Sequence, residues 1–500
     1  MSLALGDEGK DYRRFVEFWK DGRNLPPSLP RTILRRELGD LGGLPVTKKL
    51  ARTACFLCIS TLAFGAEPPK EAERYWPQWR GPHATGVSPH GSPPVEWNEE
   101  KNVQWKVRIP GRGKSTPVIW GDRLYLTTAI PTDKSVSPDS VAQPRGHGGF
   151  HHPAVSPATR YYQFVILAID RATGKTVWQR TVREDLPHEG THEYGTFASM
   201  SAITDGERVY AFFGSRGLYC FDTEGKLLWE KDLGDMIIRL GFGEGASPVL
   251  HEDKIVVSWD HEGESFILAL NRETGEELWR TERNEITSWA TPLVVEHDGG
   301  AQVVTSATRR VRSYDLATGK LIWESAGMTL NTIPSPVAAD GMVYVTSGFR
   351  GNALLAIRLS AARGDITDSD AIVWKHDRDT PYVPSPLLYE DTLYFIKRNS
   401  NVLSALDAKT GQQYFRRRLE GLNNVFASPV GADGRVYVTS REGTTAVIKS
   451  GHQPEVLATN TLDDGFDASM AIADSEIYLR GGQYLYRISE EVSPSPRSSP

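Results

Sequence analysis

The chain repeats one pattern at intervals of about 40–50 residues, and a repeat of that length strongly limits the folds available to it. The second half of the pattern is clearest in AIDRATGKTVW, which ends at Trp178. In most copies a Thr-Gly turn precedes a tryptophan. The equivalent residues along the chain are Trp105, Trp178, Trp229, Trp279, Trp323, Trp374, Phe415 and Leu457.

The first half of each unit begins with a small residue, a serine or threonine, and proline, and continues as an alternating apolar segment. ASPVLHEDKIVVSW (246–259) is one example, and PSPVAADGMVYVTS (334–347) is another. Alternation with a period of two predicts half-buried β-strands, and the GD, ED, DG and TG pairs predict tight hairpins. Each unit is therefore predicted to form four antiparallel strands, named A to D from the axis outward.

The ends of the repeat region predict how the fold closes. Seven complete units run from about residue 110 to residue 460, and residues 467–489 supply only strands A, B and C of another. Residues 102–109, NVQWKVRI, have the character of the missing D strand. Pairing these segments would remove an exposed sheet edge. We therefore predict an all-β, eight-bladed β-propeller of four-stranded antiparallel blades over residues 101–489, whose last blade is closed by the N-terminal strand.

The repeated tryptophans are predicted to have a structural role. A large flat side chain on the outer strand can fill the wedge between neighbouring blades, because a single twisted sheet cannot bury both of its faces.

The A-x-D-x-x-T-G-K-x-x-W unit resembles the pyrroloquinoline-quinone (PQQ) repeat over about residues 100–489. It is also similar to the repeat of the BamB-like propeller lipoprotein of the outer-membrane assembly machinery. The segment YWPQWRGPHATGVS (75–88) resembles the opening of exported repeat proteins of planctomycete-like bacteria. The resemblance implies the propeller fold, whereas function must be argued from the site, since one fold hosts many activities.

The N-terminal region predicts export to the periplasm or secretion. Residues 48–66, KKLARTACFLCISTLAFGA, join a basic start to an apolar stretch that is short for a bilayer span, with a cleavage point near Gly65 or Ala66. Residues 1–47 are an extension, explained either by a true start near Val46 or by a leader before a small anchoring helix. Residues 67–100 are interpreted as a linker, and 490–500 as a disordered Pro/Ser-rich tail.

Cysteine usage and charge exclude several classes. No lipobox precedes Cys55 or Cys58, which disfavours a lipid anchor, and Cys220 alone remains after processing. A single cysteine cannot form an intrachain disulfide. The net charge of −6 and the lack of basic runs give no support for nucleic-acid binding. We expect a mature chain without a transmembrane segment, and a monomer.

Histidines cluster in the connections predicted on one face of blades 1 to 3. Imidazole and carboxylate groups together suit a divalent transition metal, although their spacing matches no fixed motif, and solvated or partner-binding loops are the alternative. The candidate metal ligands are His147, His151, His152, His188, His192, Glu193, Asp260 and His261.

Cations recur in the B-to-C turns on the same predicted face. Arginines gathered there could present paired donors to carboxylates or phosphates, whereas solvated hairpin tips are the alternative. The candidate residues for binding a cofactor or an anionic ligand are Arg216, Arg309, Arg350, Arg398, Arg441 and Arg480.

Three functions remain open from the sequence. The favoured one is a binding or assembly scaffold of the cell envelope, without a cofactor and without catalytic residues, acting on an envelope protein partner. A PQQ-dependent dehydrogenase using calcium is an alternative, but the chain lacks the adjacent cysteine pair and the haem motif C-x-x-C-H that the resemblance would imply for such an enzyme. The third is a binder of an anionic small ligand or glycan in the central funnel.

Overall fold

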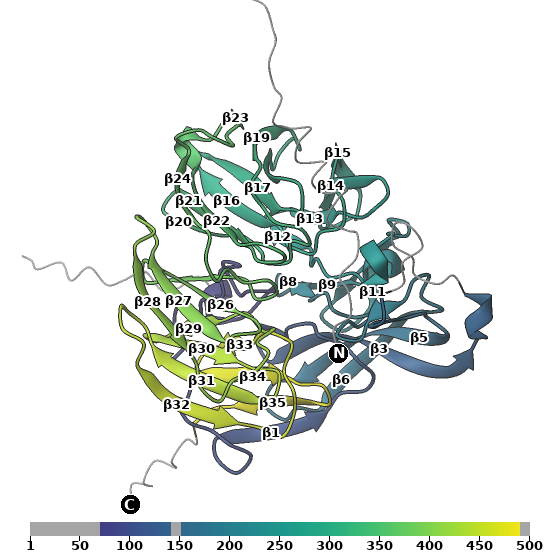
Figure 1. Cartoon of the computed structure of the whole chain (residues 1–500). Helices are drawn as coiled ribbons and strands as arrows, with labels where there is room; N and C mark the ends of the chain where they lie inside the picture. The colour runs from purple at the N-terminus through teal and green to yellow at the C-terminus, as the bar shows by residue number, and fades with distance from the viewer. Residues whose placement is uncertain (1–70, 142–151, 491–500) are drawn as a thin grey trace, which may run out of the picture. The chain divides into compact units, whose positions relative to one another are not determined.

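The computed structural model describes residues 71–141 and 152–490, which fall within one compact unit, Glu67–Pro500. Eight sheets of the described residues are arranged as blades around a common centre (Figure 1), and the predicted eight-bladed propeller is confirmed. The innermost strands of neighbouring sheets contact one another, including β33 of the last blade with β2 of the first.

Each blade contains strands A to D in the predicted order. Blade 1 has β2 (Val118–Trp120), β3 (Arg123–Ser135), β5 (Arg160–Asp170) and β6 (Thr176–Asp185). Blade 2 has β8 (Ile203–Thr204), β9 (Arg208–Phe212), β10 (Leu218–Asp222) and β11 (Leu227–Lys231). Blade 3 has β12 (Val249–His251), β13 (Lys254–Trp259), β14 (Ser265–Asn271) and β15 (Glu277–Arg283). Blade 4 has β16 (Leu293–His297), β17 (Gly300–Ser306), β18 (Val311–Asp315) and β19 (Leu321–Ser325).

The second half of the ring follows the same plan. Blade 5 has β20 (Val337–Ala339), β21 (Met342–Ser347), β22 (Ala353–Arg358) and β24 (Ile372–His376). Blade 6 has β25 (Leu387–Tyr389), β26 (Thr392–Lys397), β27 (Val402–Asp407) and β28 (Gln413–Arg418). Blade 7 has β29 (Val430–Ala432), β30 (Arg435–Thr439), β31 (Thr444–Lys449) and β32 (Val456–Thr461). Blade 8 has β33 (Ala471–Ala473), β34 (Glu476–Arg480), β35 (Tyr484–Ile488) and β1 (Val103–Arg108).

The N-terminal strand closes the ring as predicted. β1 pairs antiparallel with β35, with Trp105 opposite Arg487 and Val107 opposite Leu485. The first and last parts of the repeat region therefore share one sheet, and β1 covers the outer edge that β35 would otherwise expose.

Helical structure is confined to short 3-10 turns among the described residues. These are η1 (Glu71–Arg74), η2 (Pro138–Ser140), η4 (Gly214–Arg216), η5 (Arg239–Gly241) and η6 (Leu359–Ala361). No helix of residues 71–141 or 152–490 is long and apolar enough to span a membrane.

The Ser-Pro pattern builds a ring of hydrogen bonds around the axis. Thr116 N–H donates to Ser201 Oγ at 2.9 Å, Ser201 N–H donates to Ser247 Oγ at 3.0 Å, and the pattern continues from blade to blade. The Thr116 hydroxyl closes the ring by donating to the Ser469 carbonyl oxygen at 3.2 Å. The eight members are Thr116, Ser201, Ser247, Thr291, Ser335, Ser385, Ser428 and Ser469. These bonds satisfy backbone donors in the crowded centre, where an unpaired N–H would be costly.

The tryptophans hold neighbouring blades together, as their predicted structural role requires. Trp178 Nε1 donates to the Thr223 carbonyl oxygen of the next blade at 2.8 Å, and Trp279 Nε1 donates to that of Leu316 at 2.8 Å. Both indoles also lie against a turn glycine of the next blade, Gly225 for Trp178 and Gly319 for Trp279. The glycine therefore serves two purposes, because it adopts a positive φ and leaves room for the ring.

Two glycines of blade 4 allow the backbone requirement and the ring contact to be tested separately. Gly319 has φ +70°, and an added Cβ would lie 2.5 Å from the Trp279 ring, whereas Gly299 has φ +74° and open space around it. We expect Gly299→Ala to cost about 1 kcal/mol of unfolding free energy from backbone strain, and Gly319→Ala to cost about 2–4 kcal/mol through the added clash. Denaturant unfolding of both variants measures the difference, and equal losses would contradict the proposed tryptophan contact.

Blade 4 departs from the repeat. The C-to-D connection of blade 5 extends over residues 359–371 and adds β23 (Gly364–Asp365) in parallel to β19. Ile366 and Ala371 of this extension pack in the same apolar cluster as Trp323, which is completely buried. Trp323 Nε1 consequently donates to Gln302 Oε1 at 3.2 Å, within its own blade.

The segment 75–88, here called the plug, packs against the inner strands of blades on both sides of the ring. Trp76 exchanges backbone hydrogen bonds with Ile119 of blade 1, and Gly431 of blade 7 exchanges them with Gly86 and Ser88. Pro77 accepts from the backbone of Thr204 in blade 2. The plug therefore ties the first two blades to the seventh, although it lies outside the repeat.

Arg80 anchors the plug. Its guanidinium is completely buried and donates to the carbonyl oxygens of Pro429 (2.9 Å), Thr85 (2.7 Å) and Pro386. Burial lowers the pKa of Arg80 to about 9.

Candidate functional site: an aromatic cavity at the propeller mouth

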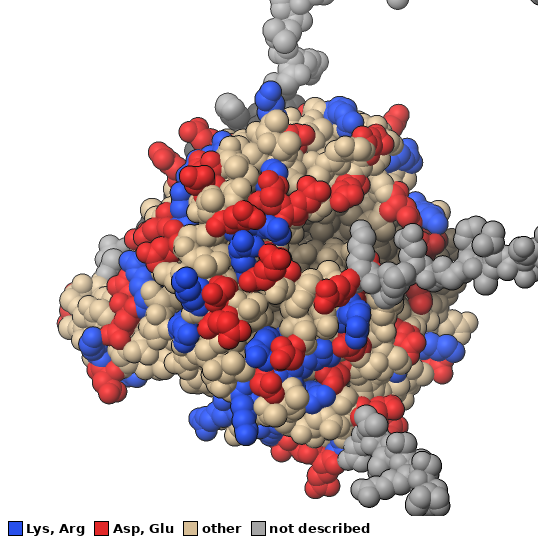
Figure 2. All heavy atoms as spheres, turned by 180° about the vertical axis from the view of Figure 1, so that it is seen from behind, with Lys and Arg blue, Asp and Glu red and all other residues tan. Residues whose placement is uncertain are grey.

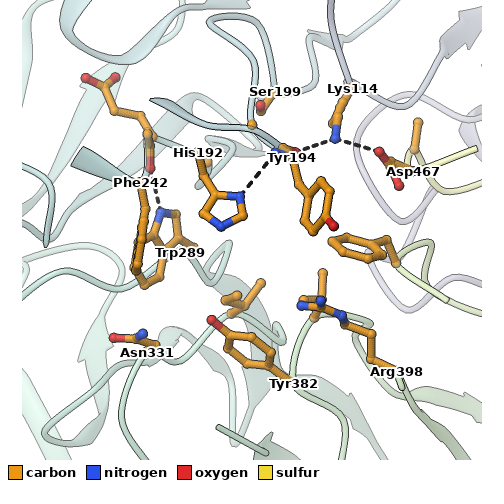
Figure 3. Close-up of a pocket in the computed structure, with 18 of the residues that line it drawn as sticks. Lys114, His192, Tyr194, Ser199, Phe242, Trp289, Asn331, Tyr382, Arg398 and Asp467 are labelled. Carbon is orange, nitrogen blue, oxygen red and sulfur yellow. Dashed lines mark hydrogen bonds and ion pairs between the residues drawn. The ribbon is translucent and has the colours of Figure 1, made fainter. Parts of the chain in front are cut away.

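A cavity of about 540 Å³ opens where the D-to-A and B-to-C connections meet. All eight D-to-A connections and three of the B-to-C connections contribute to its wall, and Trp79 contributes from the plug. Figure 3 shows the labelled side chains arranged around one open space. The lining combines aromatic rings with a few charged groups, the composition typical of small-molecule sites.

Seven of the 28 described residues that line the cavity are Trp, Tyr or Phe. Phe349 and Tyr382 stack with their ring centres 4.8 Å apart, and Phe242 lies 6.4 Å from Trp289. Trp289 is fixed by its Nε1, which donates to the Gly243 carbonyl oxygen at 2.7 Å. These rings come from blades 2, 3 and 5 and their connections, so they meet only in the closed ring.

Arg398 is the notable charge of the cavity. Its guanidinium lies 4.4 Å from the Phe426 ring centre and 5.8 Å from that of Tyr382. Within residues 71–141 and 152–490, no acidic side chain forms an ion pair with Arg398, and its Nε has no hydrogen-bond partner. Burial lowers the pKa of this guanidinium. A half-buried cation held only by aromatic faces is suited to receive an anion.

Two of the three described acidic groups that line the cavity, Asp467 and Glu244, already have partners. Asp467 pairs with Lys114 at 2.5 Å and with Arg441 at 3.1 Å. Glu244 accepts from the Ser215 N–H at 2.8 Å and from the Ser215 hydroxyl at 2.6 Å, and burial raises its pKa. Negative charge at the mouth is therefore largely neutralised.

Sequence comparison identifies the family. The model described as outer membrane protein assembly factor BamB matches residues 163–285 and 263–492. The chain belongs to this family. No curated protein sequence shows significant similarity to it.

Solved structures show the same fold as this BamB-family chain. BamB from Moraxella catarrhalis is 14% identical, with a TM-score of 0.52 and coverage of 77% of this chain and 98% of that one. The quinohemoprotein alcohol dehydrogenase of Comamonas testosteroni is 11% identical, with a TM-score of 0.55 and coverage of 85% and 82%. Quinohemoprotein alcohol dehydrogenase ADHIIG of Pseudomonas putida HK5 is 10% identical, with a TM-score of 0.51 and the same coverages.

The dehydrogenase neighbours raise the question of whether the mouth of this BamB-family propeller suits a calcium–quinone pair. Calcium requires several oxygen ligands. No group of three His, Cys, Asp or Glu side chains in the described parts of the chain is placed to hold a metal ion. Asp467 and Glu244 are also engaged by the partners given above. The described acidic residues do not fit a calcium site.

The histidine candidates of this BamB-family chain separate into three groups. His147 and His151 lie outside the described residues. His152 and His192 line the cavity with ring centres 5.6 Å apart, because β4 (Val155–Ser156) pairs with β7 (Thr191–His192). Burial, followed by the neighbouring His152, lowers the pKa of His192.

The other histidines have structural hydrogen bonds. His188 bonds to the Met236 carbonyl oxygen through Nε2 and contacts Arg216 through Nδ1. His261 Nδ1 accepts from the Ile237 N–H at 3.0 Å, which leaves Nε2 to bond to the Glu264 carbonyl oxygen.

The acidic candidates are also separated. Glu193 lines the cavity and is exposed. Asp260 is buried against Arg283, with Nε and Oδ1 3.0 Å apart, and burial raises its pKa to about 6.

The arginine candidates lie in equivalent B-to-C turns of different blades, but their surroundings differ. Arg216 lies between Asp185 and Asp235, Arg309 donates to Asn284, and Arg350 lies over Phe349. Arg398 lines the main cavity, whereas Arg441 and Arg480 line an adjoining chamber. Figure 2 shows acidic and basic side chains intermixed over one face of the molecule.

Glu189 near the mouth gives a pH-dependent prediction. Burial raises its pKa to about 7 from an ordinary 4.5, although its Oε2 accepts from the Ile238 N–H at 2.9 Å. The folded state then holds the proton more tightly than the unfolded chain. The stability that this tighter proton binding gives the folded state is fully present below about pH 4.5 and is lost as the pH rises through about 7.

We expect Glu189→Gln to stabilise the protein by about 1–2 kcal/mol at pH 8, a value reduced for solvent screening, and by less at pH 5. Thermal midpoints of both proteins at the two pH values test this. A stability difference that does not change with pH would contradict the assigned titration.

Proposed function

We propose that the protein is a binding protein of the cell envelope that takes an acidic ligand with flat apolar faces into the cavity at the propeller mouth. The carrying observation is Arg398, a half-buried cation without an acidic partner among the described residues, set against the faces of Phe426 and Tyr382. Aromatic walls suit an aromatic acid or the apolar face of an acidic sugar, and the arginine suits the carboxylate.

Envelope location is part of the proposal. It is supported by the export signal predicted at residues 48–66, which lies outside the described residues, and by membership of a family described as an outer-membrane assembly factor. That description also favours a second candidate, an assembly scaffold. In that case an acidic segment of a protein partner would enter the same cavity.

The test uses 2-naphthoate as a flat anionic probe and trigalacturonate as an acidic sugar, with 2-naphthalenemethanol as the uncharged control. Arg398→Met removes the charge and keeps the apolar stem. We expect it to weaken binding of at least one acid by about ten-fold, which corresponds to about 1.4 kcal/mol. Binding of the uncharged compound should be unchanged.

Arg309→Met is the matched control, because Arg309 is an exposed arginine in the equivalent turn of blade 4 and does not line the cavity. Calorimetric titration gives the affinities. The proposal fails if neither acid binds, or if the acids bind equally well to the wild type and to Arg398→Met.

A further inference from the structure

A second chamber of about 220 Å³ lies at the seam where blade 8 meets blade 1. Its walls come from the β1–β2 connection, from the mouth loops of blades 7 and 8, and from the connection after β6. It shares Lys114, Glu193, Asp467 and Ala468 with the main cavity, so the two spaces adjoin.

Arg480, the last residue of β34, is buried in this chamber without a countercharge. Only 3% of its surface is exposed. Its Nη1 donates to the Thr127 carbonyl oxygen at 2.7 Å and to the Ser115 carbonyl and hydroxyl oxygens. In the part of the chain that the structure describes, no acidic side chain forms an ion pair with it. Burial alone lowers its pKa to about 9.

The chamber is built to accommodate this guanidinium. Gly113 faces it, and a Cβ there would lie 2.3 Å from Arg480 Nη2. A larger residue at position 113 would therefore displace the Nη2 edge. Arg480 is among the residues that line the chamber.

The lining carries more positive than negative charge. Arg112, Lys114, Arg441 and Arg480 face two acids, Glu193 and Asp467. Asp467 is shared between Lys114 and Arg441, at 2.5 and 3.1 Å. Burial lowers the pKa of Lys114, against the effect of Asp467. A buried cation without a countercharge, next to other cations, is costly on its own. An anion that enters the site offsets this cost by pairing with the cation.

We propose that this chamber is an oxyanion site, in which Arg480 and Arg112 bind a phosphate, sulfate or carboxylate group. The group is either a free anion or the acidic end of a ligand that also fills the main cavity. The site goes beyond the proposed function, because it uses Arg480 rather than Arg398 and stands even if the main cavity binds nothing.

The first experiment titrates the full chain with inorganic phosphate at constant ionic strength, with calorimetric detection. We expect Arg480→Gln to weaken phosphate binding at least ten-fold. Arg112→Gln, at an exposed position, should weaken it several-fold without affecting the fold. Arg350→Gln, at an exposed turn of blade 5 outside the chamber, should leave it unchanged.

Because Arg480 is buried, its variant must first show an unchanged circular dichroism spectrum. If it does not fold, Arg112→Gln decides the question. Absence of phosphate binding to the wild type overturns the proposal. So does phosphate binding that both Arg480→Gln and Arg112→Gln retain in full.

Phenyl phosphate distinguishes the two sources of the oxyanion. If the acidic end of a larger ligand is bound, phenyl phosphate should bind at least ten-fold more tightly than phosphate. Tyr194 lines the main cavity, and its ring centre lies 3.9 Å from the guanidinium of Arg441 in the chamber, so Tyr194→Ala should remove only that excess. If a free anion is bound, the two compounds should bind alike, and Tyr194→Ala should change neither affinity. If Arg398→Met does not weaken binding of the acids while Arg480→Gln still weakens binding of phosphate, the proposed function is refuted and the oxyanion site is not.

Discussion

Replacing Trp323 with alanine is expected to lower the free energy of unfolding by about 3–5 kcal/mol, the usual cost of removing a buried tryptophan. Trp323 is completely buried between its own blade and the extension that carries β23. The substitution leaves a cavity between blade 4 and the extension, and it removes the hydrogen bond to Gln302 Oε1. Denaturant unfolding followed by circular dichroism gives the change in midpoint.

Leu321→Ala is the matched control for this prediction. Leu321 is on the same strand, β19, but its side chain is 49% exposed. Its removal should cost less than about 1 kcal/mol. Similar losses for the two variants would mean that the extension does not cover Trp323 as described.

The second large effect is expected at Arg80. Arg80→Met keeps an apolar stem but leaves the carbonyl oxygens of Pro429, Thr85 and Pro386 without their donor. Buried acceptors that lose a charged donor each cost about 1–3 kcal/mol, and three acceptors are affected, so we expect a total loss of at least about 3 kcal/mol. Thermal and denaturant unfolding measure this loss.

Arg74→Met provides the comparison within the same N-terminal segment. Arg74 pairs with Asp474 at 3.0 Å, but its side chain is 52% exposed, so the loss of unfolding free energy should be much smaller than that of Arg80→Met. If Arg80→Met were equally mild, the plug would contribute little to holding the blades. Limited proteolysis near residues 75–88 would then be unchanged, whereas we expect it to accelerate in Arg80→Met.

The sequence was sufficient to predict the blades because the same packing problem recurs in each unit. Trp178, Trp229 and Trp279 all occupy one position on strand D and all bond to the next blade. The segment 102–109 likewise had one available partner in the repeat region, the last unit, which lacks its own D strand. Periodicity made both visible.

The site was harder to predict because its parts do not repeat. Phe242, Trp289 and Phe426 lie on connections of irregular length and meet only when the ring is closed. The plug carries no periodic signal, so Trp79 and Arg80 gave no sign of their positions. The GFGEG segment (241–245) has no nucleotide-binding context, yet it contributes Phe242 and Glu244 to the cavity wall.

The arginines show why equivalent sequence positions need not share a function. Arg216 is held by Asp185 and Asp235, and Arg441 is held by Asp467. Arg398 has aromatic neighbours instead of acids. Acidic neighbours come from other blades and connections, so a single turn does not reveal which cation remains available.

Strand β1 sets the order in which this protein can mature. Its partner β35 is synthesised at the opposite end of the repeat region, so blade 8 cannot form until nearly all of the chain is available. A contact of such long sequence separation is slow to form, and an open sheet edge persists until it does. A chain truncated before residue 484 should therefore leave the edge of β1 unpaired and self-associate. Closure of blade 8 thus depends on synthesis of nearly the whole repeat region.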